Sequence, residues 1–128
     1  MGESGKRILV IDDSAPYLDF MRTLLSSEGY QVDTASTSAA GEQHLDSARP
    51  DLIITDALLP GMPPFGILDL LAQRKDAQDV PILICTAAAH ETRAQAARFK
   101  QEGISVLLKP FDIEVLLDRV AQLCAGTG

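Results

Sequence analysis

Five short runs of apolar and β-branched residues recur along the chain and predict β-strands. They occupy residues 8–11, 30–35, 52–55, 82–85 and 104–108. The first, third and fourth runs are apolar almost without interruption, as expected for strands that are buried on both faces of a parallel sheet. In the second run Tyr30, Val32 and Thr34 alternate with Gln31, Asp33 and Ala35, which predicts an edge strand with one face in solvent.

Each strand is followed by a segment with helical signals. The first helix begins near Pro16 and ends before Gly29, and the second covers residues 38–48, with a serine as its candidate cap. Gly103 ends a thinly apolar fourth helix, and Asp112 caps the last one. Four of the helices have apolar residues at helical spacing that are expected to face the core. They are Leu18, Met21 and Leu25 in the first helix and Ile67, Leu68 and Leu71 in the third. In the fourth helix they are Ala94, Ala97 and Phe99, and in the last helix they are Ile113, Leu116, Leu117, Val120 and Cys124.

Strands and helices therefore alternate five times, which predicts an α/β fold with a parallel sheet. Right-handed crossovers between parallel strands place helices on both faces of such a sheet. The length of 128 residues suits one domain. Because neither an internal repeat nor a low-complexity linker interrupts the pattern, we expect a single domain over residues 7–124, with flexible tails at residues 1–6 and 125–128.

The composition excludes several classes of protein. Hydrophobic residues make up 46% of the chain and charged residues 23%, which is typical of a globular domain and not of a disordered chain. The net charge of −7 argues against direct nucleic-acid binding, which needs a basic surface. Since no apolar run approaches the roughly 20 residues of a membrane span and no signal peptide opens the chain, we expect no membrane association and a cytoplasmic location. The two cysteines, Cys85 and Cys124, form no CxxC motif, which excludes a disulfide scaffold or a cysteine zinc site.

Polar residues follow the ends of four of the predicted strands. In chain order they are Asp12, Asp13, Asp56, Thr86 and Lys109. The carboxyl ends of parallel strands share one edge of the sheet, where doubly wound folds bind their ligands. One aspartate in such a place is common in turns and helix caps. All five residues together instead indicate a functional site with three carboxylates, one hydroxyl and one ammonium group.

The residue types suggest phosphoryl chemistry with a metal ion. Three neighbouring carboxylates repel one another unless a cation joins them, and oxygen ligands favour a hard ion such as Mg²⁺. A carboxylate beside such an ion can attack phosphorus and become an acyl phosphate. Mg²⁺ and Lys109 would neutralise charge during that step. The Thr86 hydroxyl would hydrogen-bond the new phosphoryl oxygens and couple the chemistry to a conformational change.

Four motifs together give the chain a family resemblance. They are ILVIDDS at residues 8–14, DLIITDALLPGM at 51–62, PILICTA at 81–87 and LLKPF at 107–111. With these motifs, nearly the whole chain resembles the receiver domain of two-component response regulators. The resemblance implies a flavodoxin-like doubly wound (βα)5 fold, with a five-stranded parallel sheet in the order 2-1-3-4-5.

The resemblance also implies a role for each site residue. Asp56 would accept a phosphoryl group from a phosphohistidine on a sensor histidine kinase or a phosphotransfer protein. Lys109, with a cis bond to Pro110, would pair with that phosphoryl group, and Thr86 would be the switch hydroxyl. The implied Mg²⁺ ligands are Asp13 directly, Asp12 through water, Asp56, and the backbone carbonyl of Leu58.

The chain departs from the family pattern in three places. Val106 stands three residues before the lysine, where the family often has an aromatic residue, so the usual coupling between threonine and aromatic rotamers cannot operate. The pair Pro63 and Pro64 lies in the loop after Asp56 and is expected to shift or stiffen the start of the third helix. Two apolar residues, Leu58 and Ala88, stand at positions that in the family flank the path of the attacking water, and neither can orient it.

Other functions fit the sequence less well. A phosphatase of the haloacid dehalogenase type would need an acidic residue where Leu58 stands. A flavin-binding electron carrier would need a phosphate-binding loop where Asp12 and Asp13 repel phosphate. The main alternative is a constitutive interaction module that never uses phosphorylation. For a phosphorylated receiver we expect the output partner to bind the face formed by the fourth helix, the fifth strand and the last helix.

Overall fold

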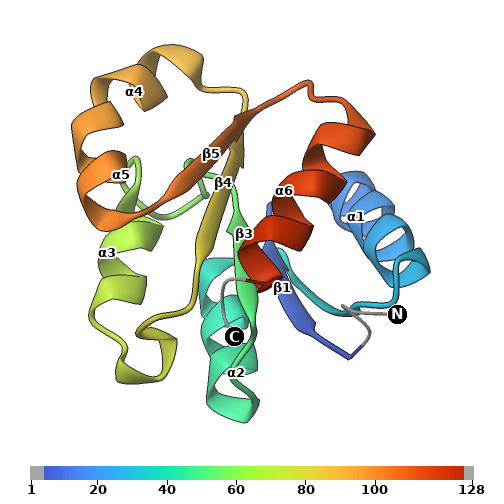
Figure 1. Cartoon of the computed structure of the whole chain (residues 1–128). Helices are drawn as coiled ribbons and strands as arrows, with labels where there is room; N and C mark the ends of the chain where they lie inside the picture. The colour runs from blue at the N-terminus through green and yellow to red at the C-terminus, as the bar shows by residue number, and fades with distance from the viewer. Residues whose placement is uncertain (1–4, 126–128) are drawn as a thin grey trace.

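A five-stranded parallel sheet forms the centre of the protein. The computed structural model describes residues 5–125, and its strands pair in the order β2-β1-β3-β4-β5 (Figure 1). The strands are β1 (Arg7–Ile11), β2 (Gln31–Ala35), β3 (Leu52–Thr55), β4 (Ile82–Thr86) and β5 (Ser105–Leu108). The predicted α/β class and strand order are therefore confirmed. Of the expected tails, residues 1–4 and 126–128 lie outside the described residues.

The burial of each strand follows from its place in the sheet. β1, β3 and β4 lie between other strands and are almost wholly buried. β2 and β5 form the two edges and are mostly half-buried. In β2 the neighbouring residues Asp33 and Thr34 point to opposite faces of the sheet, and each is half-buried beside an arginine side chain. Arg7 donates to the Asp33 carboxylate at 2.8 Å, and Arg22 donates to the Thr34 hydroxyl at 2.5 Å.

Helices cover both faces of the sheet and enclose two hydrophobic cores (Figure 1). The helices α1 (Ala15–Ser27) and α6 (Ile113–Ala125) cover one face, and their core includes Met21, Leu116, Val120 and Cys124. The other face carries α2 (Ser38–Ser47), α3 (Gly66–Ala72), the 3-10 turn η1 (Lys75–Ala77), α4 (Ala89–Ala94) and α5 (Ala96–Glu102). Successive residues of β1 alternate between the two cores, as the pleat of a strand requires. Burial on both faces makes the sheet a rigid support for side chains at its edge.

Side chains that cap helix ends explain where the first two helices begin. The Ser14 hydroxyl accepts a hydrogen bond from the Tyr17 amide and starts α1, with Pro16 in the first turn. The cap of α2 is Thr37, whose hydroxyl accepts from the Ala40 amide at 3.1 Å, and not the serine that we expected. A threonine one residue earlier performs the same task because either hydroxyl can reach a free amide of the first turn.

The third helix begins directly after the proline-rich loop. α3 begins only at Gly66, after Phe65 adopts a left-handed conformation with φ of 61°. A bulky residue rarely adopts this conformation. Phe65 is held there because its amide donates to the Ala57 carbonyl at 2.9 Å and its buried ring packs against Phe99, with 5.6 Å between ring centroids. A Cβ on Gly66 would lie 3.1 Å from the Pro63 ring, so any larger residue there would have to displace that ring by a few tenths of an ångström.

The predicted fourth helix is wrong in one respect, since it is two short helices. α4 ends at Ala94 and α5 begins at Ala96, with Gln95 between them. Ala94 and Ala97, which we expected to face the core, are exposed. The buried residues are Thr92 in α4 and Phe99 in α5. Because one phenylalanine is the main apolar anchor of this segment, the two helices are attached to the sheet more weakly than α1 or α6.

Candidate functional site

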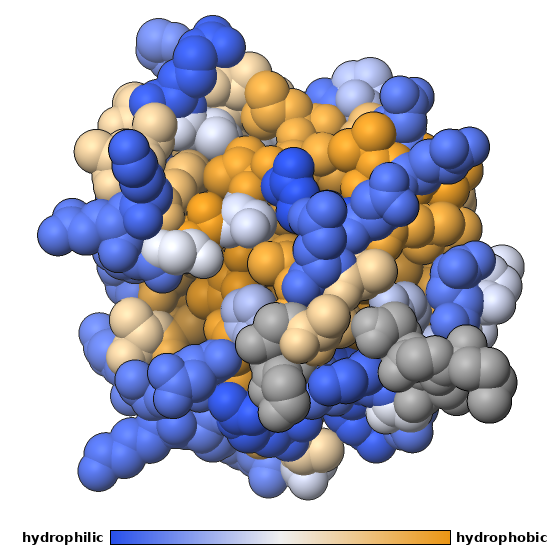
Figure 2. All heavy atoms as spheres, viewed as in Figure 1, coloured by the Kyte–Doolittle hydropathy of each residue, from blue (hydrophilic) through white to orange (hydrophobic). Residues whose placement is uncertain are grey.

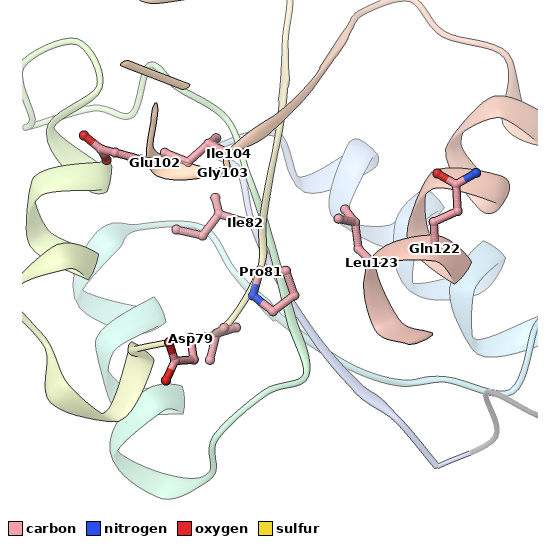
Figure 3. A pocket seen from close by; sticks show the side chains of 9 residues that line it. Asp79, Pro81, Ile82, Glu102, Gly103, Ile104, Gln122 and Leu123 are labelled. Atoms are coloured by element: carbon pink, nitrogen blue, oxygen red, sulfur yellow. The ribbon is translucent and has the colours of Figure 1, made fainter. Parts of the chain in front are cut away.

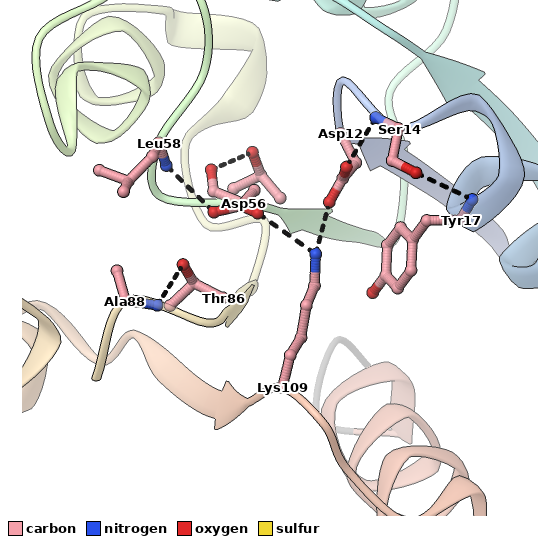
Figure 4. A network of polar contacts seen from close by, with 9 residues as sticks. Asp12, Ser14, Tyr17, Asp56, Leu58, Thr86, Ala88 and Lys109 are labelled. Carbon is pink, nitrogen blue, oxygen red and sulfur yellow. Dashed lines mark hydrogen bonds and ion pairs between the residues drawn. The ribbon is translucent and has the colours of Figure 1, made fainter.

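The parallel strands bring the predicted site residues to one edge of the sheet. Ile11 pairs with Thr55, so Asp12 and Asp56 leave neighbouring strands at the same level. Thr86 ends β4 opposite Leu108, and the Lys109 amide donates to the Thr86 carbonyl at 2.9 Å. The bond between Lys109 and Pro110 is cis, as expected. Four side chains from four strand ends therefore lie close together (Figure 4).

The ammonium group of Lys109 joins two of the carboxylates. Its Nζ donates to Asp12 Oδ2 at 2.7 Å and to Asp56 Oδ2 at 3.2 Å. Asp12 is buried and Asp56 is half-buried, so both carboxylates have lost part of their contact with water. Burial lowers the pKa of Lys109, but the hydrogen bonds and charge of Asp12 and then of Asp56 outweigh this effect and raise the pKa overall. The lysine therefore carries its positive charge at neutral pH.

The second oxygen of each of these carboxylates, in Asp12 and Asp56, accepts a hydrogen bond from a backbone amide. Asp12 Oδ1 accepts from the Ser14 amide at 2.9 Å, and Asp56 Oδ1 accepts from the Leu58 amide at 3.1 Å. Thr86 is arranged in the same way, since its hydroxyl oxygen accepts from the Ala88 amide at 3.2 Å. These turns place the backbone N–H groups of Leu58 and Ala88, two residues after Asp56 and Thr86, at the same edge, where each donates back to that side chain (Figure 4). Backbone N–H groups of this kind can bind an anion.

The oxygen donors for a metal ion are only partly assembled. Asp13 lies beside Asp12 in the chain, but its side chain is exposed. Within residues 5–125, no three acidic, histidine or cysteine side chains are grouped closely enough to hold an ion. The lysine ammonium instead forms ion pairs with both Asp12 and Asp56 in this arrangement. The donor types still fit Mg²⁺, because the carboxylates of Asp12 and Asp56 lie at one edge of the sheet and Asp13 directly follows Asp12 in the chain.

One residue of this region was not expected from the sequence. Tyr17, in the first turn of α1, places its ring 4.0 Å from the Lys109 ammonium. Its hydroxyl is buried without a hydrogen-bond partner of good geometry. Burial and then the neighbouring thiol of Cys85 raise the pKa of Tyr17, and burial also raises the pKa of Cys85, to about 12. Nothing in the sequence indicates this contact, because Tyr17 and Lys109 stand 92 positions apart.

A separate hollow lies at the other end of β4 and β5 (Figure 3). It encloses about 450 Å³ and contains the carboxylates of Asp79 and Glu102. Its lining residues are Asp79, Val80, Pro81, Ile82, Glu102, Gly103, Ile104, Gln122 and Leu123. None of the five predicted site residues is among them, and the lining brings two negative charges without a basic side chain. The predicted site residues therefore lie at the carboxyl edge of the sheet and not in this hollow.

Comparison with known proteins identifies the family. The model of the response regulator receiver domain matches residues 8–121. The regulator RpaA of Synechocystis, described as a DNA-binding dual master transcriptional regulator, is 32% identical over 121 residues; the match covers 94% of this chain and 50% of RpaA. The chain thus spans half the length of this relative.

Solved structures show the same fold. The chemotaxis response regulator CheY4 of Vibrio cholerae is 26% identical with a TM-score of 0.81, and the match covers 94% of this chain and 99% of CheY4. The receiver domain of the sensor histidine kinase PA1611 of Pseudomonas aeruginosa is 23% identical with a TM-score of 0.80. The match covers 95% of this chain and 99% of the PA1611 domain. The PA1611 structure has a magnesium ion coordinated in its active-site cleft. Among residues 5–125 of the present chain, no helix has both the length and the apolar content that crossing a membrane requires. The fold, the matched family model and the relatives together show that the chain belongs to the response regulator receiver domain family, whose members are phosphoacceptors in two-component signalling.

Proposed function

We propose that Asp56 is the phosphoacceptor of this receiver and that Lys109 and Thr86 bind the phosphoryl group. The observation that carries the proposal is the Lys109 ammonium between Asp12 and Asp56, at 2.7 and 3.2 Å. Asp56 is the half-buried member of this carboxylate pair, whereas Asp12 is 2% exposed and cannot be approached by a donor. An oxygen of Asp56 is therefore the nucleophile.

The proposed reaction is a phosphoryl transfer from a phosphohistidine of a sensor histidine kinase or a phosphotransfer protein. A carboxylate oxygen of Asp56 bonds to phosphorus while the P–N bond to the donor imidazole breaks. The electron pair stays on the imidazole nitrogen, which then takes a proton from water. The Lys109 ammonium and the amides of Leu58 and Ala88 bind the phosphoryl oxygens, which lowers the cost of bringing anionic groups together. The protein thereby promotes its own phosphorylation.

The proposed metal is Mg²⁺, which would neutralise phosphoryl charge when bound. Asp13 would bind it directly and Asp12 through water, with Asp56 and the Leu58 carbonyl as further ligands. For this to occur Asp13 must turn toward the site and Lys109 must release Asp12. A phosphoryl group on Asp56 favours this exchange, because its oxygens offer Lys109 a new anionic partner.

The signal is proposed to leave through β4 and the two short helices. The Thr86 hydroxyl, which accepts from Ala88 in the unphosphorylated protein, would donate to a phosphoryl oxygen and pull the β4–α4 loop. Thr92 is buried with an unpaired hydroxyl, and Gln95 interrupts the helix, so this segment can rearrange at low cost. Val106 is half-buried and cannot pass the signal as an aromatic residue would.

The output partner is proposed to bind the face of α4, β5 and α6. Leu108, Ile113 and Val115 are exposed there at 39%, 45% and 43%, so the expectation that Ile113 faces the core is wrong. Figure 2 shows apolar side chains over the part of this face where β5 and α6 lie in Figure 1, bordered by polar ones. Exposed apolar groups within a polar rim are typical of protein interfaces.

Phosphorylation with a small-molecule donor tests this function. Acetyl phosphate with Mg²⁺ should add one phosphoryl group, measured by intact mass, and the Asp56→Asn variant should acquire none. Asp118→Asn is the matched control, since Asp118 is an exposed aspartate of α6, and it should be labelled as the parent is. Full labelling of Asp56→Asn would rule out Asp56 as the acceptor. A parent that takes no label from acetyl phosphate or phosphoramidate would instead support the phosphorylation-independent interaction module.

A further inference from the structure

The ring of Tyr17 contacts the lysine of the site from outside the four motifs that carry the resemblance. Lys109 Nζ lies 4.0 Å from the ring centroid, and Figure 4 shows the ring beside the ammonium group. A cation over the face of an aromatic ring is attracted by the electron density of that face. The roles proposed above for Asp12, Asp56 and Thr86 do not use this contact.

The turn that holds Asp12 also fixes the position of Tyr17. The Ser14 amide donates to Asp12 at 2.9 Å, and the Ser14 hydroxyl accepts from the Tyr17 amide at 3.3 Å. One serine therefore links the carboxylate that binds Lys109 to the backbone that carries the ring. The ring reaches the site from α1, on the opposite side of Lys109 from Thr86 (Figure 4).

The ring, and not the hydroxyl, accounts for the placement of Tyr17. The hydroxyl is buried beside the Cys85 thiol without a hydrogen bond of good geometry, which is unfavourable. It stays neutral, because burial and the Cys85 thiol disfavour its ionised form and raise its pKa. What remains favourable is the contact of the ring face with the ammonium group and the apolar packing of the ring against the core of α1 and α6.

An uncharged contact suits a lysine that must change partners. The ammonium has three N–H donors, and Asp12 and Asp56 use two of them. A carboxylate in place of the ring would compete with the phosphoryl group for the lysine. Without the ring, the flexible four-carbon stem would let the ammonium move into water. The ring attracts the ammonium group without occupying any of its N–H donors, so these donors remain available to Asp12, Asp56 and the phosphoryl group.

We propose that Tyr17 is a positioning residue for phosphoryl transfer, its ring holding the Lys109 ammonium beside the oxygens of the phosphoryl group on Asp56. This inference rests on the proposed function of Asp56. It assigns to α1 a direct contact with the charged group that stabilises the transferred phosphoryl. Substitutions of Tyr17 should therefore act through Lys109 and should depend on the ring alone.

Three variants separate the ring from the hydroxyl and from the helix. Tyr17→Leu removes the ring and should lower the rate constant for labelling by acetyl phosphate about fivefold to thirtyfold, the range expected for losing a partly desolvated cation–ring contact. Tyr17→Phe keeps the ring and should restore the rate to within about twofold of the parent. Phe20→Leu changes the next aromatic residue of α1, whose ring centroid lies 6.5 Å from that of Tyr17, and should leave the rate unchanged.

A measurement on the side chain of Lys109 distinguishes positioning from a structural role. The ring current of Tyr17 should shift the Cε protons of Lys109 upfield of those of the exposed Lys75 and Lys100 in NMR spectra of the parent. The shift should persist in Tyr17→Phe and disappear in Tyr17→Leu. Because the first comparison needs only the parent protein, it holds even where Tyr17→Leu fails to fold.

The outcomes separate this inference from the proposed function. Normal labelling of folded Tyr17→Leu, or an unshifted Lys109 signal in the parent, would overturn the role of Tyr17 while leaving Asp56 as acceptor. Equal slowing in Tyr17→Phe and Tyr17→Leu would also overturn it, because the ring would then not be the active part. Labelling that survives in Asp56→Asn would instead overturn the proposed function itself.

Discussion

Replacing Lys109 with methionine removes the only cation that the structure shows between Asp12 and Asp56 within residues 5–125. Bonds of 2.7 and 3.2 Å from one nitrogen place the two carboxylate oxygens no more than 5.9 Å apart. Two unit charges at that distance repel by about 3 kcal/mol when the effective dielectric constant is about 20. Lys109 has a side-chain exposure of 22%, so water and salt screen part of this repulsion. We therefore expect Lys109→Met to lose about 2 kcal/mol of unfolding free energy without a divalent ion.

Urea denaturation followed by far-ultraviolet circular dichroism measures this loss. At a typical denaturant dependence, a loss of about 2 kcal/mol lowers the unfolding midpoint by about 1 M urea. Adding Asp56→Asn to Lys109→Met should regain most of the loss, because only one of the two carboxylates then remains charged. Lys100→Met, at an exposed lysine of α5, is the control and should change stability by less than about 0.5 kcal/mol. An equally large loss in the double variant would refute the reasoning, since it would show that packing and not charge explains the effect.

Three further predictions follow from other parts of the site. Leu58 and Ala88 cannot orient a water molecule, so self-dephosphorylation should be slow, and a Leu58→Asn, Ala88→Glu double variant should lose its label faster; an unchanged decay rate would contradict this role. Beryllofluoride should change amide hydrogen exchange mainly between residues 86 and 103, because Phe99 is the main anchor of that segment; a response confined to α2 or α3 would place the output elsewhere. The pKa of Cys85 is raised to about 12 by burial, so this thiol should not react with iodoacetamide near pH 8 until the protein is unfolded, and alkylation of Cys85 in the native protein would show that β4 opens.

The placement of the site could be predicted because it depends on topology. Parallel strands end at one edge, so residues that directly follow them must meet there, and Asp12, Asp56, Thr86 and Lys109 do. The buried strands were predictable for a related reason, since only strands covered on both faces are apolar throughout. The expected roles of these residues in phosphoryl transfer stay predictions.

Features that depend on tertiary contacts could not be predicted. The left-handed conformation of Phe65 exists because its ring packs on Phe99, a residue 34 positions later. The break at Gln95 has no proline or glycine to indicate it, and alanines at helical spacing proved to be exposed. The contact of Tyr17 with Lys109 joins the first and last parts of the chain. Local patterns carry no information about such distant partners.

Chemical trapping of the phosphorylated residue tests the role of Asp56 most directly. Borohydride reduces an aspartyl phosphate to homoserine, which peptide mass spectrometry can locate in the chain. After treatment with acetyl phosphate and Mg²⁺, homoserine should appear at position 56 and nowhere else, because Asp56 is the accessible carboxylate beside the Lys109 ammonium. Homoserine at position 12 or 13, or label on a residue away from the sheet edge, would contradict the assignment of Asp56 as the phosphoacceptor.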